Sequence, residues 1–191
     1  IELDVRFSKD GIVYVFHDDD LKRMFSQKKL FRSLDSKDIE KLSLQGEKIP
    51  RLKEALTLIQ GQVPLIIEIK PCENYRELVD DVMFLLQDYQ GDYCIKSFDP
   101  KTMIYLRFHY PKVIRGFLLG TSKIYEKPWK GKLYASLVLN LLMRPDFLSV
   151  SKRFKKNHLP IRLYEMMGGH VAIWTVRSKK EIDRDFIIFE Y

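Results

Sequence analysis

The sequence predicts an α/β fold in which parallel strands alternate with helices. Short apolar runs recur along the chain, as expected of strands buried in a sheet. Between them lie segments whose apolar residues repeat at helical spacing, as in helices that cover a sheet. Strands and helices that alternate in this way form βα units, which build parallel sheets.

The chain opens with a strand whose charged residues share one face. Apolar and charged side chains alternate over the first six residues, the period of two of a pleated strand. This alternation places Glu2 and Asp4 on the same side, about 7 Å apart along the strand. On an ordinary half-buried strand such a side faces solvent, so the pair alone does not define a site.

A second strand is expected at 12–16, and it ends in a polar run. These residues follow a Lys-Asp-Gly turn and are apolar on both faces, which is typical of a strand buried on both sides. His17, Asp18, Asp19 and Asp20 come directly after them. Polar residues that follow buried strands are typical of active-site rims, because the strand fixes the side chain while the loop admits substrate.

The remaining elements follow in alternation. Further strands are expected at 63–70, 93–98, 113–119, 147–151, 170–176 and 186–191. Helices are expected at 36–42, 52–59, 75–89, 99–106, 133–142 and 164–167. Ser36 is the expected N-cap of the first helix, and Gly61 is expected to end the second.

The strand at 63–70 adds a third carboxylate. Glu68 and Lys70 share one of its faces near its end. Carboxylates at strand ends, with a lysine and a histidine beside them, suit a divalent cation that holds a phosphate. The alternative interpretation is a salt bridge between Glu68 and Lys70.

Composition favours one globular domain over residues 1–191. The chain is 46% hydrophobic with a net charge of +7. Its dense basic runs, at 151–156 and 177–180, are expected to be solvated rather than to bind nucleic acid.

No apolar run reaches the roughly eighteen residues of a membrane span. Two cysteines, Cys72 and Cys94, form no disulfide framework, so a cytoplasmic location is the default. A parent protein that associates with a membrane surface is also compatible with the sequence.

Five motifs in order carry a family resemblance. They are IELDVRFSKDGIVYVFHDDDLKR, KIPRLKEAL, LIIEIK, IKSFDP and VAIWTV. In order and spacing they resemble the glycerophosphodiester phosphodiesterase family over nearly the whole chain. The resemblance implies a TIM (βα)8 barrel that uses a divalent metal, Mg²⁺ or Ca²⁺, to hydrolyse glycerophosphodiesters to glycerol 3-phosphate and an alcohol.

The resemblance also assigns roles to residues. Glu2, Asp4 and Glu68 match the metal ligands, and His17 matches the second histidine of a catalytic acid–base pair. Lys70 matches a phosphate-binding lysine, and Trp174 a residue that lines the substrate pocket, although a tryptophan at a barrel end is often a core residue. The family's His-Arg-Gly strand, which carries the first histidine, has no counterpart in the sequence.

The strand count raises an expectation about the chain's extent. Seven parallel strands are one fewer than a closed barrel needs, so a further strand is expected before Ile1. Residues 179–185 are too few for a crossover between parallel strands, so a segment is also expected to be missing near Asp183.

Two other functions stay open on sequence grounds. One is a non-catalytic barrel that binds glycerophosphoryl groups or a partner, and the other is a headgroup lyase that forms a cyclic phosphate. The sequence does not fix the headgroup, the metal, the nucleophile or the oligomeric state.

Overall fold

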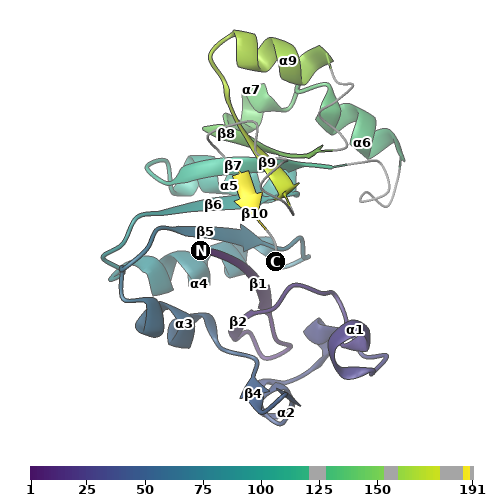
Figure 1. The fold of residues 1–191 in the computed structure, drawn as a ribbon, viewed down its shortest axis with the longest axis vertical. Helices are drawn as coiled ribbons and strands as arrows, with labels where there is room; N and C mark the ends of the chain where they lie inside the picture. The colour runs from purple at the N-terminus through teal and green to yellow at the C-terminus, as the bar shows by residue number, and fades with distance from the viewer. Residues whose placement is uncertain (121–127, 153–158, 177–186, 190–191) are drawn as a thin grey trace. The chain divides into compact units, whose positions relative to one another are not determined.

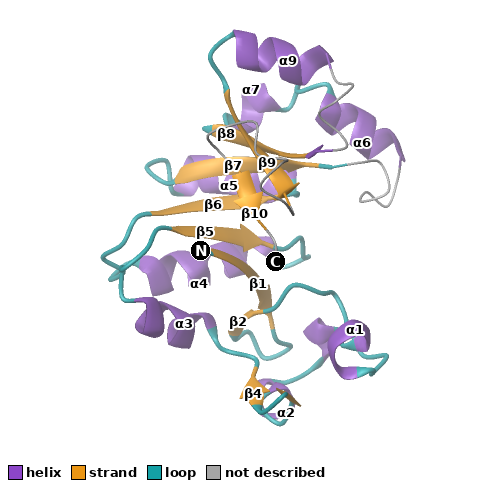
Figure 2. Cartoon of the chain, in the orientation of Figure 1, coloured by secondary structure: helices purple, strands orange, loops and turns teal. Residues whose placement is uncertain are grey.

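The computed structural model describes residues 1–120, 128–152, 159–176 and 187–189. Its chain divides into two compact units, Ile1–Cys94 and Ile95–Tyr191. Figures 1 and 2 show that strands and helices alternate along the chain, as the sequence predicts. The expectation of a single domain stays a prediction. None of the described helices is long and apolar enough to cross a membrane.

The sheet of the first unit places the charged strands side by side. β1 (Glu2–Phe7) lies between β5 (Leu65–Ile69), which runs parallel to it, and β2 (Val13–Val15), which runs antiparallel. The register sets Asp4 directly opposite Glu68. Because register partners in a parallel pair point to the same face, both carboxylates leave the sheet on one side.

Two helices of the first unit form where the periodicity predicts them. α3 (Leu52–Ile59) begins with a hydrogen bond from the Arg51 N–H to the Glu54 carboxylate at 2.8 Å, and α4 (Tyr75–Leu86) follows β5. Gln60 and Gly61 both have positive φ, so the chain leaves α3 in the left-handed region that glycine favours. The predicted stop at Gly61 is confirmed.

The segment between β2 and α3, residues 16–51, has a small core that it shares with Tyr14 of β2. Its elements are α1 (Lys22–Phe25), the 3₁₀ helix η1 (Phe31–Ser33), α2 (Ser36–Ile39), β3 (Ser43–Leu44) and β4 (Glu47–Lys48). The core brings together six buried residues: Tyr14, Phe16, Leu21, Phe31, Leu34 and Ile39. The rings of Phe16 and Phe31 stack at 4.6 Å between centroids. We call residues 16–51 the β2–α3 insertion.

The predicted start of α2 was wrong by one residue. Asp35, not Ser36, is the N-cap, and the helix ends at Ile39. Ser36 is already helical, and its N–H and hydroxyl donate to the carboxylate of Asp10 at 2.8 and 2.6 Å. The Ser8 hydroxyl donates to the same carboxylate at 2.7 Å. A side chain from the β1–β2 turn therefore satisfies a free N–H at the start of α2.

The second unit continues the alternation. In its sheet β6 (Tyr93–Ser97), β7 (Ile114–Leu119), β8 (Phe147–Ser151), β9 (His170–Val176) and β10 (Ile187–Phe189) are neighbours in chain order. The pairs β7–β8, β8–β9 and β9–β10 are parallel, as predicted. α5 (Pro100–His109) begins after Asp99, whose carboxylate accepts the N–H of Lys101 at 3.0 Å. Residues 177–186, where a missing segment was expected, lie outside the described residues.

Two helix predictions in the second unit need correction. The helix expected at 133–142 is two helices, α6 (Pro128–Ala135) and α7 (Asn140–Met143), because Leu137 has a φ of 60°, which a right-handed helix cannot contain. α9 (Leu159–Met166) begins before residue 164. Pro160 lies in its first turn, where a proline interrupts no helical hydrogen bond.

Gly116 of β7 makes room for the ring of Phe147 on β8. The two residues are register partners. A Cβ at Gly116 would lie 2.3 Å from the Phe147 ring, well inside van der Waals contact. The strand therefore carries glycine here for space rather than for backbone conformation.

Candidate active site

The three predicted metal ligands converge in the first unit. Glu2 and Asp4 from β1 and Glu68 from β5 offer oxygen atoms that all lie within 4.8 Å of one another. Glu68 is buried at 4% exposure, whereas Glu2 is exposed. Alternation along β1 and the Asp4–Glu68 register bring about this convergence. We call these three residues the carboxylate group.

Lys70 lies against the carboxylate group. Its ammonium donates to Oε1 of Glu68 at 2.6 Å and lies 2.7 Å from Oδ1 of Asp4. Burial of Lys70 opposes its charge, but the neighbouring carboxylates of Glu68 and Asp4 outweigh burial and raise the Lys70 pKa above its ordinary value. The Glu68–Lys70 salt bridge, the alternative interpretation of this strand end, is therefore present.

Oδ1 of Asp4 is buried and lies 2.7 Å from the Lys70 ammonium. A buried carboxylate of this kind needs a cation or hydrogen-bond donors beside it. Three carboxylates meet here beside the ammonium of Lys70, so a divalent cation would complement their charge. The residues fit a divalent ion with oxygen ligands.

His17 follows β2 and is held by Asp18 and Arg23. Nδ1 of His17 lies 2.6 Å from Oδ1 of Asp18. Arg23 donates to both oxygens of the same carboxylate, at 2.7 and 3.1 Å. The hydrogen bond from Arg23, opposed in part by burial, keeps the pKa of Asp18 below its usual range, and His17 contributes. Asp18 is thus a carboxylate that fixes the orientation of the imidazole.

Arg6 is a site residue that sequence reasoning missed. Its Nε and Nη2 donate to the backbone carbonyl of His17 at 3.1 and 2.9 Å. Its Nη1 lies 2.7 Å from Oδ1 of Asp19. Arg6 follows Glu2 and Asp4 at intervals of two residues along β1, so the same period could have placed it on the carboxylate face. Through these contacts Arg6 links β1 to the start of the loop that follows β2.

Trp174 lies in the second unit, on β9. Its Nε1–H donates to the carbonyl of Ser149 at 3.1 Å, and its ring meets Phe98 edge to face at 5.8 Å between centroids. The side chain is half-buried. With its N–H committed to the backbone, the indole offers a ligand only its ring surface.

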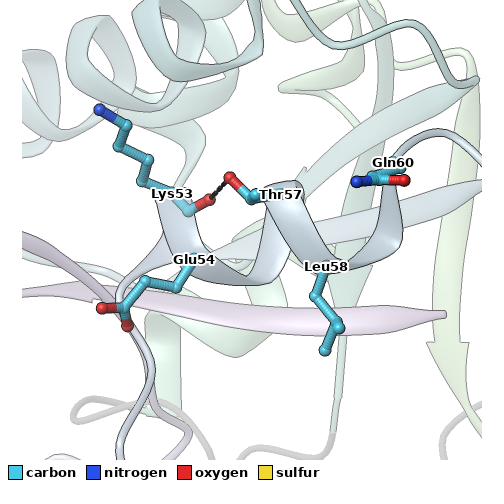
Figure 3. Close-up of a pocket in the computed structure, with 5 residues that line it drawn as sticks. All are labelled: Lys53, Glu54, Thr57, Leu58 and Gln60. Atoms are coloured by element: carbon cyan, nitrogen blue, oxygen red, sulfur yellow. Dashed lines mark hydrogen bonds between the residues drawn. The ribbon is translucent and has the colours of Figure 1, made fainter.

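A hollow elsewhere on the first unit contains none of the predicted site residues. It lies along α3 and is lined by five residues of that helix and its end: Lys53, Glu54, Thr57, Leu58 and Gln60 (Figure 3). Thr57 donates to the carbonyl of Lys53 at 2.9 Å, the hydrogen bond drawn there. The hollow brings together no cluster of charges comparable to the carboxylate group, so we assign it no role in chemistry.

Parallel βα units that gather polar side chains near the ends of neighbouring strands are characteristic of barrel enzymes. The sequence pattern of the glycerophosphoryl diester phosphodiesterase family matches residues 1–186, and the chain belongs to this family. It is therefore a phosphodiesterase, a hydrolase of phosphoric diesters.

Two sequence relatives are similar to this chain. YhdW of Bacillus subtilis (strain 168) is 24% identical over 190 residues, which span 94% of this chain and 75% of YhdW. Glycerophosphodiester phosphodiesterase GDPD4 of Arabidopsis thaliana is 31% identical over 107 residues, half of this chain and 33% of the plant protein.

The solved structures confirm the fold class. The Oleispira antarctica phosphodiesterase in complex with the product sn-glycerol-3-phosphate has a TM-score of 0.79 at 22% identity, with 98% of this chain and 79% of that chain covered. The Thermotoga maritima glycerophosphodiester phosphodiesterase has a TM-score of 0.71 at 27% identity, with 98% and 80% covered. The chain thus has the α/β, TIM-barrel class that the motifs implied.

Proposed function

We propose that this chain hydrolyses glycerophosphodiesters to glycerol 3-phosphate and an alcohol, with a divalent cation bound by Glu2, Asp4 and Glu68. The observation that carries the proposal is the convergence of these three carboxylates beside Lys70. The product seen in the Oleispira antarctica structure supports glycerol 3-phosphate as the common product.

The carboxylate group and Lys70 would bind the phosphate end of the substrate. A bound Mg²⁺ or Ca²⁺ supplies a Lewis acid that polarises a phosphoryl oxygen. Lys70 has three N–H donors, of which one forms the hydrogen bond to Glu68. A remaining donor can bind a phosphoryl oxygen and neutralise charge that develops there. The same ammonium holds Asp4 and Glu68 together before substrate arrives.

His17 would act as a general acid–base that transfers a proton through Nε2. Its Nδ1–H is donated to Asp18, which leaves Nε2 with a lone pair in the neutral ring. Nε2 then either accepts a proton from the nucleophile or, once protonated, donates it to the departing alcohol oxygen. Asp18 and Arg23 fix the ring orientation from one side, and Arg6 fixes the backbone of His17 from the other.

Trp174 would contact substrate through its ring. Since its N–H is used by Ser149, the indole has no hydrogen bond to offer a ligand. We therefore assign Trp174 a packing contact rather than a polar one.

The test is hydrolysis of glycerophosphocholine and glycerophosphoethanolamine by the purified chain with Mg²⁺, with Ca²⁺ and with chelator. Glycerol 3-phosphate should appear only with metal. Glu68→Gln should weaken metal binding, measured by calorimetry, and His17→Ala should lower kcat by about 10²–10⁴-fold without loss of metal binding. Glu47→Gln, an exposed carboxylate of β4, is the matched control and should leave both quantities unchanged.

Three outcomes would contradict the proposal. Full activity in excess chelator would remove the metal from the mechanism. A cyclic phosphate product would make the chain a lyase. Substrate binding without turnover in any metal would leave a binding module.

A further inference from the structure

Three helices of the second unit expose large apolar side chains. Trp129 and Leu133 of α6 are 58% and 37% exposed, and Leu141 and Leu142 of α7 are 77% and 53% exposed. On α9, Leu163 is 47% and Met166 82% exposed. We call these six residues the outer apolar surface. Isolated exposed apolar residues need no explanation, but such a concentration within one segment marks an interaction site.

Topology places these helices on one side of the sheet. α6 and α7 connect β7 to β8, and α9 connects β8 to β9, two neighbouring parallel pairs. Successive right-handed crossovers between adjacent parallel strands lie on the same face of a sheet. Met143 of α7 and Ile161 of α9 are buried, so these two helices each have an inner face against the protein. The exposed apolar residues occupy other positions on the same helices.

The same segment accounts for most of the net positive charge of the chain. Residues 128–167 contain eight lysines and arginines but only two acidic residues, which is +6 of the total +7. Among the described residues, Arg144, Lys152 and Arg162 are exposed there. Apolar and basic side chains are thus interspersed at the surface of one set of helices.

We propose that the outer apolar surface docks this protein on an anionic lipid bilayer. Apolar side chains enter the boundary between headgroups and acyl chains, while lysine and arginine side chains bind anionic headgroups; amphipathic helices that lie on membranes have this composition. Tryptophan suits the same boundary because its ring is amphipathic. A second copy of this chain would bring like charges together, which disfavours self-association through this surface. The inference does not depend on the proposed hydrolysis.

The experiment is flotation of the purified chain with vesicles. Vesicles of phosphatidylcholine alone are compared with vesicles of equal parts phosphatidylcholine and phosphatidylglycerol. The chain should float with the anionic vesicles and be released at about 1 M salt, where the screening length falls to about 3 Å. The double variant Leu141→Glu, Met166→Glu should bind at least about tenfold more weakly, and Arg162→Glu should also weaken binding.

The matched control is Leu58→Glu on α3. Leu58 is 81% exposed, as accessible as the substituted residues, but lies in the first unit. The Leu58→Glu variant should bind vesicles as the unchanged chain does. Circular dichroism and thermal unfolding should be alike for all variants, since every substituted side chain is exposed.

Several outcomes would overturn the proposal. They are absence of binding to anionic vesicles, equal weakening by Leu58→Glu, or a dimer by light scattering that the double variant dissociates. The last result would identify the surface as an interface between copies. None of these readouts requires turnover, so a failed hydrolysis assay leaves the docking test intact.

Discussion

Asp18 holds the imidazole of His17 through a contact of 2.6 Å between Oδ1 and Nδ1. The same carboxylate accepts two hydrogen bonds from Arg23 of α1. The ring orientation of the proposed catalytic histidine is therefore set by its own chain neighbour, which is itself fixed by the next helix. Residues of this kind act through the group they hold rather than on the substrate.

Asp18→Asn should lower kcat by about 10–100-fold with little change in KM. The amide no longer accepts the Nδ1–H as a charged partner, so the tautomer with a lone pair on Nε2 loses its stabilisation. Steady-state kinetics across pH will measure this change. Asp19→Asn is the comparison, because Asp19 is 81% exposed and contacts Arg6 instead. Equal losses in the two variants would contradict a specific action of Asp18 on His17.

Lys70→Met should make the fold depend on metal. Removal of the buried ammonium takes away the positive charge that Lys70 places beside Asp4 and Glu68, which should cost about 3–5 kcal/mol of the free energy of unfolding in chelator. Saturating Mg²⁺ or Ca²⁺ should restore much of that loss, because a ligand that binds only the folded state stabilises it. Urea unfolding with and without metal measures both the loss of stability and its recovery. Lys53→Met, an exposed lysine of α3, should show neither effect.

Asp10 should contribute a pH-dependent term to stability. Hydrogen bonds from the hydroxyls of Ser36 and Ser8 lower the pKa of Asp10 to about 2, from 3.8. Because the folded-state pKa is depressed, this contribution is complete above about pH 4 and is lost as the pH falls toward 2.

The measurement is acid-to-neutral unfolding of the chain beside Asp10→Ala. The variant should be less stable by about 1 kcal/mol at pH 6, as expected for loss of a helix-start hydrogen bond, and the difference should vanish near pH 2. A difference that stays constant down to pH 2 would mean that the carboxylate charge contributes nothing.

Gly116→Ala should destabilise the second unit by about 1–3 kcal/mol, because the new methyl group meets the Phe147 ring. Phe147→Leu removes that ring, so the double variant should be more stable than the sum of the two single changes indicates. A double-mutant cycle from urea unfolding measures the coupling. Strict additivity would show that the ring moves aside without cost.

Much of the fold was predictable because strand and helix periods are local. β1, β5, β8 and β9 form where alternation or apolar runs place them. The errors fall where a distant contact or a single backbone torsion decides the outcome. Asp10 satisfies the start of α2 from a turn far earlier in the chain, and Leu137 divides an apolar run that looks continuous in the sequence.

In the candidate site, too, some features follow from local sequence patterns and others depend on distant contacts. The carboxylates of Glu2 and Asp4 share a face by alternation alone, but their approach to Glu68 needs the register of β1 and β5, which no local pattern contains. The hydrogen bonds of Arg6 to the His17 carbonyl depend on the antiparallel pairing of β1 and β2.

The core of the β2–α3 insertion has an evolutionary consequence. Phe31 and Ile39 of the insertion pack with Tyr14 of β2, so these core residues come from outside the strands that carry the carboxylates. The part of the insertion that follows Arg23 can therefore be replaced or lengthened while His17, Asp18 and the acidic residues keep their places. A lineage could diversify its substrates by changing that part alone and leave the inherited chemistry untouched.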